Sequence, residues 1–191
     1  MYKDMTEILR DKKVGDFELS HFEIGEHDLY AMLHHIPTGK FVRLTHRVEC
    51  VMSNTEMEKR TNAEFVRKAH GNVLIGGLGI GLILLAIQDN PAVESITVVE
   101  KYEEVIQLVA EQLPLNDKVS IVRGDVFIYN PTQKFNTIYM DIWSYINTDV
   151  YEKSMKPLMT KYRKFLVPKS EDSERFIECW CRNEAKRGVR I

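Results

Sequence analysis

The stretch Val73-Leu-Ile-Gly-Gly-Leu-Gly-Ile-Gly-Leu-Ile-Leu-Leu-Ala-Ile87 decides the fold, because every one of its residues is apolar or glycine. Its middle holds four of the ten glycines in the chain, crowded into six positions. Three apolar residues, a glycine cluster and a second apolar run are typical of a buried strand, a tight turn and a buried helix. The pattern therefore predicts a nucleotide-binding βαβ unit.

Two other interpretations of this stretch are weaker. A transmembrane helix could use the spacing of Gly77 and Gly81 for close packing, but spanning a bilayer takes about 20 apolar residues, and polar residues such as Asn72 and Gln88 bound this run. A single core helix is also disfavoured, since each interior glycine costs about 1 kcal/mol relative to alanine. A turn explains the glycines best.

The totals indicate an ordinary globular domain. A chain of 191 residues is long enough to bury a substantial core. Its 44% hydrophobic and 28% charged residues, with a net charge of -2, favour neither disorder nor a generally basic nucleic-acid-binding surface. The charged residues 1–13 lack the apolar core of a secretion signal. We therefore expect a cytoplasmic protein with no membrane partner.

The cysteines and histidines do not predict a metal site. Cys50 stands alone, and Cys179 and Cys181 alternate in a predicted strand, which places both on one face. All six histidines lie between His21 and His70, far along the chain from the cysteine pair. Free thiols agree better with this pattern than metal ligands do, and they also agree with a reducing compartment.

Residues 1–53 are predicted to form a β-hairpin segment. Segments 17–24, 29–33 and 40–48 carry β signals, and a turn at 37–39 precedes the last of them. From Asn54 the pattern changes to a helix that ends near residues 70–71. Ser53 or Thr55 can cap that helix, and Glu56 and Glu58 lie in its first turn. The residues that we expect toward the core are Met57, 63–66 and Ala69.

Strands and helices alternate beyond this helix, which indicates a parallel sheet covered by helices on both faces. The predicted strands are 73–75, 96–100, 119–123, 135–140 and 175–181. A helix over 150–166 contains Pro157, which either kinks it or lies in the first turn of a new segment. We predict an α/β fold of three layers over residues 54–191, with the strand order 3-2-1-4-5.

Ligands of such a sheet bind beyond the carboxyl ends of its strands. Glycine lets the backbone approach a bound nucleoside, a carboxylate can accept both ribose hydroxyls, and a further aspartate can accept from an adenine amino group. The residues at these strand ends are Gly76, Gly77, Gly79, Gly81, Glu100, Gly124, Asp125 and Asp141. Their chemistry predicts a nucleoside site.

The spacing of the glycines distinguishes between cofactors. A dinucleotide fingerprint requires G-x-G-x-x-G, and no register of these glycines satisfies it, because position 82 is leucine. The G-x-G-x-G of Gly77, Gly79 and Gly81, followed by Glu100, instead resembles the class I S-adenosylmethionine-dependent methyltransferases over about residues 54–181. The resemblance implies a Rossmann-like methyltransferase fold and S-adenosylmethionine as the cofactor.

Within that superfamily, segments 75–81 and 99–106 and the preceding hairpins look like the spermidine synthase branch. This resemblance implies that Gly77, Gly79 and Gly81 line the methionine part of the cofactor and that Glu100 holds the ribose. It also implies that Asp125 with Val126 contacts adenine and that Asp141 faces the transferred group. The cofactor-binding residues that it implies are Gly76, Gly77, Gly79, Gly81, Glu100, Lys101, Asp125 and Val126.

The chain also departs from that branch. The aminopropyltransferases carry an acidic Asp-Ser-x-Asp-Pro-like loop after the fourth strand, whereas this chain has Asp141-Ile-Trp-Ser-Tyr145. Many methyltransferases have an acid two residues before the first glycine of G-x-G-x-G. This chain has Ile75 at that position, and the spermidine synthase branch likewise lacks the acid there. The usual last antiparallel pair of strands has no room after Cys181, so we expect a reduced pocket or one completed by another subunit, as in a homodimer.

Each site residue has a plainer alternative. Glu100 could be a surface acid, Asp125 a turn residue, and Asp141 a cap of the following loop. Trp143 and Tyr145 fit core packing as well as a substrate platform. The basic residues of the last predicted helix are expected on a solvated face, which does not support a nucleic-acid partner; they are Lys153, Lys156, Lys161, Arg163 and Lys164.

The expected function is methyl transfer from S-adenosylmethionine to a small-molecule acceptor, with Asp141 as the catalytic residue that orients or deprotonates the nucleophile. Two alternatives stay open. One is aminopropyl transfer from decarboxylated S-adenosylmethionine to a diamine, and the other is a binding module without catalysis. The acceptor itself is not identified, because its specificity depends on loops of generic composition.

Overall fold

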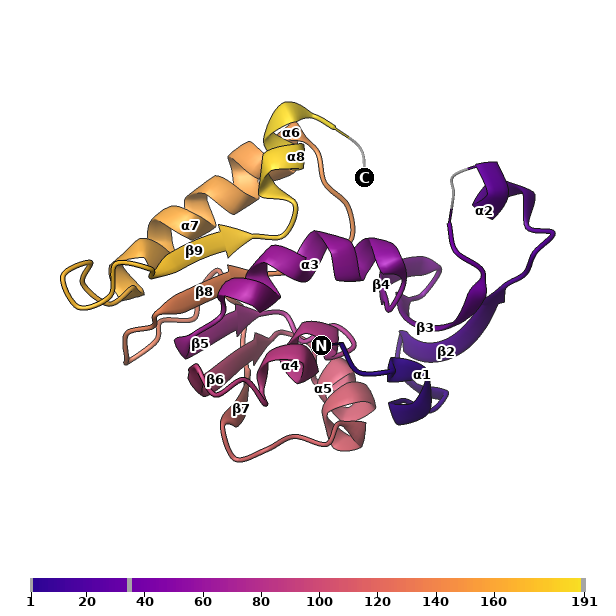
Figure 1. The fold of residues 1–191 in the computed structure, drawn as a ribbon, viewed down its shortest axis with the longest axis horizontal. Helices are drawn as coiled ribbons and strands as arrows, with labels where there is room; N and C mark the ends of the chain where they lie inside the picture. The colour runs from indigo at the N-terminus through magenta and orange to yellow at the C-terminus, as the bar shows by residue number, and fades with distance from the viewer. Residues whose placement is uncertain (1, 34–35, 190–191) are drawn as a thin grey trace.

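The computed structural model describes residues 2–33 and 36–189, which form two sheets. One is a four-stranded antiparallel sheet in the order β1-β2-β3-β4, and the other has five strands in the order β7-β6-β5-β8-β9. The first sheet lies beside the second, toward one end of the molecule (Figure 1).

The first sheet is built from residues before position 54. Strands β2 and β3 pair along their whole length, from Phe17 opposite His46 to Ile24 opposite Gly39. The elements are α1 (Met5–Ile8), β1 (Lys12–Val14), β2 (Phe17–Ile24), α2 (Leu29–Leu33), β3 (Gly39–His46) and β4 (Glu49–Ser53).

The β prediction for residues 29–33 is wrong, because this segment is the short helix α2. Asp28 begins it by accepting the backbone N–H of Ala31 at 2.9 Å. Leu29 and Leu33 are 74% and 78% exposed. Apolar residues favour a strand when a sheet is available to bury them. Residues 29–33 instead lie in the connection between β2 and β3, where no sheet buries Leu29 or Leu33.

The second sheet confirms the predicted α/β fold. All of its strands pair in parallel, and the order β7-β6-β5-β8-β9 is the expected 3-2-1-4-5. Its elements are α3 (Glu56–Lys68), β5 (Gly71–Gly76), α4 (Leu82–Ile87), β6 (Val93–Glu100), α5 (Glu103–Val109), η1 (Ala110–Gln112), β7 (Val119–Arg123), β8 (Thr137–Met140), α6 (Thr148–Val150), η2 (Tyr151–Met155), α7 (Lys156–Tyr162), η3 (Arg163–Phe165), β9 (Phe176–Cys179) and α8 (Arg182–Arg187).

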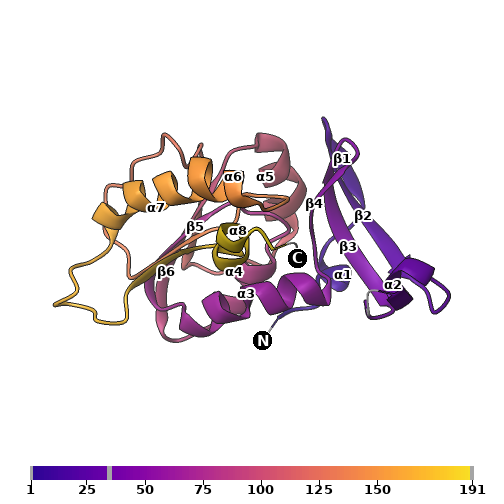
Figure 2. The same cartoon turned by 90° about the horizontal axis from the view of Figure 1, so that it is seen from above.

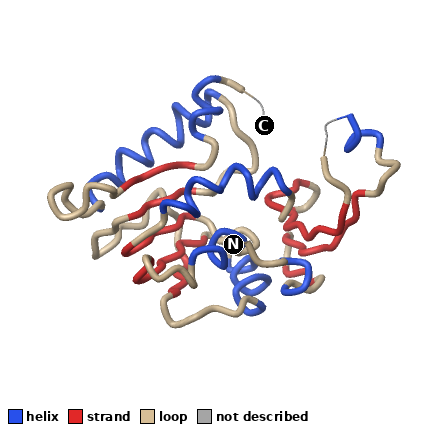
Figure 3. The backbone as a smooth tube through the Cα atoms, in the orientation of Figure 1, coloured by secondary structure: helices blue, strands red, loops and turns tan. Residues whose placement is uncertain are grey.

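Helices cover both faces of this sheet, which gives the three layers of a Rossmann-like fold. Val73 and Ile75 of β5 pack in one hydrophobic cluster with side chains of α3, α4 and α5. Leu74, which points to the other face, packs in a second cluster with α7. Figure 2 shows α3 and α7 on opposite sides of the strands, and Figure 3 shows the helices flanking them.

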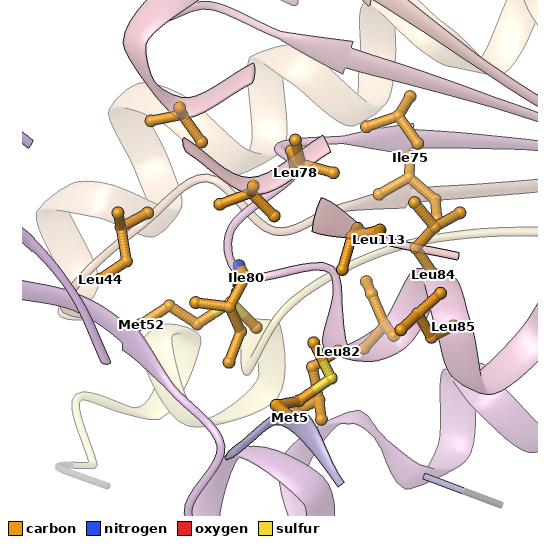
Figure 4. Close-up of a cluster of buried hydrophobic side chains, with 14 of the residues drawn as sticks. Met5, Leu44, Met52, Ile75, Leu78, Ile80, Leu82, Leu84, Leu85 and Leu113 are labelled. Atoms are coloured by element: carbon orange, nitrogen blue, oxygen red, sulfur yellow. Dashed lines mark hydrogen bonds between the residues drawn. The ribbon is translucent and has the colours of Figure 1, made fainter. Parts of the chain in front are cut away.

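The antiparallel sheet shares its core with the parallel one. Met5, Leu44 and Met52 belong to the same buried cluster as Ile80 and Leu82 from the segment that follows β5. Figure 4 shows these side chains side by side. Residues before position 54 therefore form one wall of the same folded body.

The helix predicted over 150–166 is present as a continuous helical run from Thr148 to Phe165, in which the hydrogen-bonding type changes from α to π, back to α and then to 3-10. A π-helical turn, Tyr151–Met155, precedes α7, and Pro157 lies in the first turn of α7. Pro157 therefore lies at the start of an α-helical part of the run, directly after the π-helical turn. The basic tail adds helix α8, which the sequence pattern did not predict, and which ends at Gly188 in the left-handed region with φ of 67°.

Helix α3 presents an unexpected inner face. Phe65 and Ala69 are buried as predicted, but Ala63 is exposed. Glu58 and Asn62 are buried instead, at 7% and 0% exposure. The prediction for Ala63 is wrong because the buried positions 58, 62, 65 and 69 follow helical spacing along one stripe of α3, and Ala63 lies off that stripe.

The three cysteines are free thiols, with Cys50 exposed and Cys179 and Cys181 buried. The last two line one groove, but the predicted strand over 175–181 is too long, because β9 ends at Cys179 and Cys181 is the N-cap residue of α8, with a left-handed φ of 48°. Among the described residues, no cluster of histidine, cysteine or carboxylate side chains could hold a metal ion. No helix in that part of the chain has the length and apolar character needed to cross a membrane.

Candidate functional site

A cavity of about 320 Å³ opens at the carboxyl ends of the parallel strands. This volume falls at the lower end of the range for small-molecule sites. Two of the predicted cofactor residues, Gly76 and Gly81, do not line it. The predicted residues that do line it are Gly77, Gly79, Glu100, Lys101, Asp125, Val126 and Asp141. Their roles in binding stay predictions, but the fold places their side chains or backbones around one space.

The glycine turn needs glycine for its backbone and for its neighbours. Gly77 and Gly79 have φ of 93° and 51°, in the left-handed region that side chains disfavour. A Cβ on Gly77 would lie 2.2 Å from the carbonyl oxygen of Asp141, and one on Gly79 would lie 2.2 Å from Sδ of Met52. The atoms that come closest to these glycines are therefore those of Asp141 and Met52. Both glycines also line the cavity.

Glu100, at the end of β6, ties the second strand to the glycine turn. Its carboxylate accepts the backbone N–H of Leu78 at Oε2 and that of Tyr102 at Oε1, both at 2.8 Å. Glu100 is 6% exposed. Burial raises its pKa, although these hydrogen bonds oppose the shift. Glu100 also lines the cavity, and a carboxylate has about four lone-pair positions, more than the backbone contacts named here use, so hydroxyl groups can still bind to it.

Asp125 is both a turn residue and a cavity residue. Its Oδ1 accepts the N–H of Phe127 at 2.9 Å, and its Oδ2 lies 3.1 Å from Nζ of Lys101. Burial acts to raise the pKa of Asp125, but these two contacts lower it overall. The hydrogen bond with Asp125 raises the pKa of Lys101 in turn. The turn interpretation is therefore confirmed, and contact of Asp125 with adenine stays a prediction.

Helix α7 anchors the loop that follows Asp125. Nζ of Lys161 donates to the carbonyl oxygens of Val126, Phe127 and Tyr129 at 3.0, 2.9 and 2.6 Å. Tyr162 adds a hydrogen bond to Val126 at 2.9 Å. The solvated-face prediction is therefore wrong for Lys161, which stabilises one wall of the cavity. The loop comes from a distant part of the chain, so helical periodicity alone could not reveal this contact.

Asp141 follows β8 and lies beside a carboxylate that the sequence interpretation missed. Burial raises the pKa of Asp141 to about 7, against the effect of a hydrogen bond from Asn62. Burial, and then the charge of Asp141, raise the pKa of Glu58 to about 8. Glu58 lines the same cavity. From the sequence, Glu58 is explained as an acid in the first turn of a helix, where it compensates the helix dipole. Its position in the sequence gave no sign that it lies near Asp141.

Asn62 links this acidic pair to the sheet. Its Oδ1 accepts the hydroxyl hydrogen of Tyr139 at 2.8 Å, and its Nδ2 donates to the backbone carbonyl of Glu58 at 3.1 Å. Tyr139 lies in β8, two residues before Asp141. This network fixes the first turns of α3 against the end of β8 and so sets the spacing of the two acids.

Aromatic residues complete the cavity. Trp143 donates its indole N–H to Ser154, and Trp180 donates to Thr61, both at 3.0 Å. Both tryptophans line the cavity, whereas Tyr145 does not line it and is 62% exposed. A role as a substrate platform therefore remains open for Trp143 and is excluded for Tyr145 within this cavity. No residue pattern singled out Trp180.

The antiparallel sheet forms a further wall of the cavity, beside the residues that follow the parallel strands. Phe17 stacks on His46 with 4.5 Å between ring centroids and contacts the Tyr102 ring at 4.9 Å. Met52 lies over Gly79, with its sulfur 3.4 Å from the backbone nitrogen of Ile80. The hairpin segment thus contributes directly to the site.

Comparison with known proteins gives matches to solved structures alone. No protein-family model matches the sequence, and no curated protein matches it. The matching structures include the DhpI-SAM-HEP complex, at 17% identity, with 59% of this chain and 50% of that chain covered and a TM-score of 0.46. They also include the N-methyltransferase NodS from Bradyrhizobium japonicum WM9 in complex with S-adenosyl-L-homocysteine, at 16% identity, with coverage of 60% and 59% and a TM-score of 0.48.

A third match is a putative caffeoyl-CoA O-methyltransferase from Staphylococcus aureus, at 15% identity, with coverage of 72% and 58% and a TM-score of 0.44. The chain spans between half and three fifths of these three structures. Likeness at this level concerns the fold and does not extend to a reaction or an acceptor.

Proposed function

We propose that this protein transfers a methyl group from S-adenosylmethionine to a small-molecule acceptor. The observation that carries the proposal is the convergence of Gly77, Glu100, Asp125 and Asp141 on one cavity at the carboxyl edge of the sheet. A nucleoside site of an open parallel sheet is expected at this edge. S-adenosylmethionine supplies a methyl group that its sulfonium already activates, so the protein has mainly to bind, orient and exclude water.

The residues around the cavity fit such a ligand. Glu100 and Asp125 both line the cavity, and we propose that Glu100 accepts ribose hydroxyls and that Asp125 accepts from an adenine amino group. Lys161 keeps the loop over residues 126–129 in place. Asp141 is the group that we propose takes a proton from the acceptor, because a pKa of about 7 suits a base at neutral pH.

A second candidate is aminopropyl transfer from decarboxylated S-adenosylmethionine to a diamine. The pairing of Glu58 with Asp141 favours it, since two acids in one cavity can hold a cationic amine. The antiparallel sheet along the cavity is a further feature of the spermidine synthase branch that the sequence resembles. The departure of residues 141–145 from the acidic loop of that branch counts against it.

Calorimetry and a comparison of donors test these proposals. We expect the protein to bind S-adenosylmethionine and S-adenosylhomocysteine, and to move a labelled methyl group onto a component of a small-molecule extract. The variant Asp141→Asn should retain binding of S-adenosylhomocysteine and lose transfer. If neither nucleoside binds, the cofactor proposal is wrong. If putrescine yields a polyamine product from the decarboxylated donor alone, aminopropyl transfer replaces methyl transfer; binding without any transfer indicates a binding module.

A further inference from the structure

His70 lies between two hydrogen-bond acceptors at the amino edge of the parallel sheet, where α3 has ended and β5 begins. Its Nδ1 is 2.8 Å from the carbonyl oxygen of Lys68, and its Nε2 is 2.9 Å from Oδ2 of Asp172, a residue 102 positions later in the chain. A neutral imidazole carries one N–H and can donate to one acceptor, whereas an imidazolium donates from both nitrogens. The surroundings of the ring therefore fit its protonated form.

Asp172 is held in a position that favours its charged form. Its Oδ1 accepts the backbone N–H of Glu174 at 2.9 Å, and its Oδ2 accepts a side-chain N–H of Asn136 at 2.8 Å in addition to the contact with His70. Burial acts to raise the pKa of Asp172, but these contacts lower it overall. The His70 and Asp172 side chains are 25% and 15% exposed, and salt screens a partly buried ion pair less than a surface pair.

The charged groups around His70 act in the same direction. Burial acts to lower the pKa of His70, but the hydrogen bonds with Lys68 and Asp172 and the charges of Asp172 and Glu174 raise it above its ordinary value of 6.5. The ammonium group of Lys68 lies 2.6 Å from the carboxylate of Glu64. Strands β5 and β8 contain no charged residue. The proton on His70 is therefore favoured by the loop before β9 and by the end of α3.

The ion pair joins two elements that both reach the cavity. His70 follows α3, whose first turns carry Glu58, and Asp172 lies in the loop of residues 168–175, which leads into β9. Directly after β9, Trp180 donates its indole N–H to Thr61 of α3 at 3.0 Å. Two contacts therefore tie α3 to β9 and its flanking residues, one at each edge of the sheet. Since Glu58 and Trp180 both line the cavity, the position of these two elements affects its walls.

We propose that the His70–Asp172 pair is a pH-dependent lock between α3 and the loop that leads into β9. The charged ring donates to both acceptors, whereas a neutral ring keeps one N–H, so the contact with either Lys68 or Asp172 is lost. Because the folded protein binds this proton more tightly than the unfolded chain, the lock contributes fully below pH 6.5 and is lost as the pH rises through the pKa of the folded state. The loop and the start of β9 then become more mobile. This inference does not depend on the reaction proposed for the cavity.

Nuclear magnetic resonance of the full-length protein tests the lock. The ring signals of His70 are followed from about pH 5 to about pH 9, a range that spans the titration of a histidine. Hydrogen exchange of the backbone amides of residues 169–174 is measured over the same range and corrected for intrinsic exchange. The variants are Asp172→Asn, which removes the charge and keeps the shape, and His70→Gln, which removes the titrating ring and identifies its signals. The control is His27→Gln, because His27 is an exposed histidine in the turn after β2.

We expect the pKa of His70 to lie above 6.5 in the wild type and in His27→Gln, and to shift downward in Asp172→Asn. The loop amides of the wild type should exchange faster above this pKa than below it, and those of His70→Gln should exchange at one fast, pH-independent rate. A His70 pKa at or below 6.5, a pKa that Asp172→Asn leaves unchanged, or equal loop exchange on both sides of the pKa would each overturn the proposal. The two wild-type measurements decide the question even if Asp172→Asn does not fold.

Discussion

The backbone N–H of Leu78 donates a 2.8 Å hydrogen bond to Oε2 of Glu100. This contact joins the middle of the glycine turn to the end of the neighbouring strand, 22 residues later in the chain. It means that the acid proposed to bind ribose also fixes the turn that lines the same cavity. Binding and local stability are therefore coupled at Glu100.

Replacing Glu100 by glutamine should weaken both properties. The new amide nitrogen would face an N–H donor, from Leu78 or Tyr102, in place of an acceptor. We expect affinity for S-adenosylhomocysteine to fall at least tenfold and the free energy of unfolding to fall by about 1–3 kcal/mol, as measured by calorimetry and urea denaturation. Glu103→Gln is the control, since the Glu103 side chain is 41% exposed and its carboxylate lies 3.5 Å from Arg123. Unchanged affinity in Glu100→Gln would exclude the ribose role.

Gly77→Ala tests the geometry of the turn. The Cβ would lie 2.2 Å from the Asp141 carbonyl oxygen, at a backbone φ of 93°. Backbone strain of this kind costs about 1–3 kcal/mol, and the steric contact adds to it, so the unfolding free energy should drop by at least that amount. Gly25→Ala is the control, because a Cβ there meets no atom within 4 Å. Equal stabilities of the two variants in urea would show that the turn differs from the one described.

The buried acid Glu58 should make stability depend on pH. Its pKa is about 8 in the folded protein against an ordinary value of 4.5, so the folded state binds the proton more tightly. Stability is then full below about pH 4.5 and declines as the pH rises toward 8. Each unit of pKa difference corresponds to about 1.4 kcal/mol. Urea denaturation at several pH values should show a flatter dependence for Glu58→Gln than for wild type, and the wild-type dependence for Glu56→Gln.

Lys161→Met removes the ammonium group that binds three carbonyl oxygens of the loop after Asp125. We expect the free energy of unfolding to fall by about 1–3 kcal/mol, with weaker binding of S-adenosylhomocysteine because the loop loses its anchor. Lys153→Met provides the comparison, as the Lys153 side chain is 75% exposed and its partner Asp149 is 73% exposed. A loss of the same size in both variants would mean that charge alone, and not the anchor, matters.

The sequence by itself determined the central sheet. Alternating apolar segments and the glycine turn of residues 76–81 are local signals, and the strand order followed from the way βαβ units pack. Parallel strands also bring their carboxyl ends to one edge, so most of the residues predicted there line one cavity, although Gly76 and Gly81 do not. Thus Glu100, Asp125 and Asp141 could be named in advance as neighbours of one space.

Only the tertiary structure decided which polar side chains are buried and what they contact. Glu58, Lys161 and Trp180 reach the cavity or its walls from helices and a strand end that are remote in sequence. Their residue types suit a solvated helix face or a packed core equally well, so periodicity cannot distinguish these roles. The short helix α2 was missed because local apolar content does not say whether a sheet is present to bury it. The pairing of Glu58 with Asp141 depends on how α3 crosses the end of β8, and this is a property of packing, not of spacing along the chain.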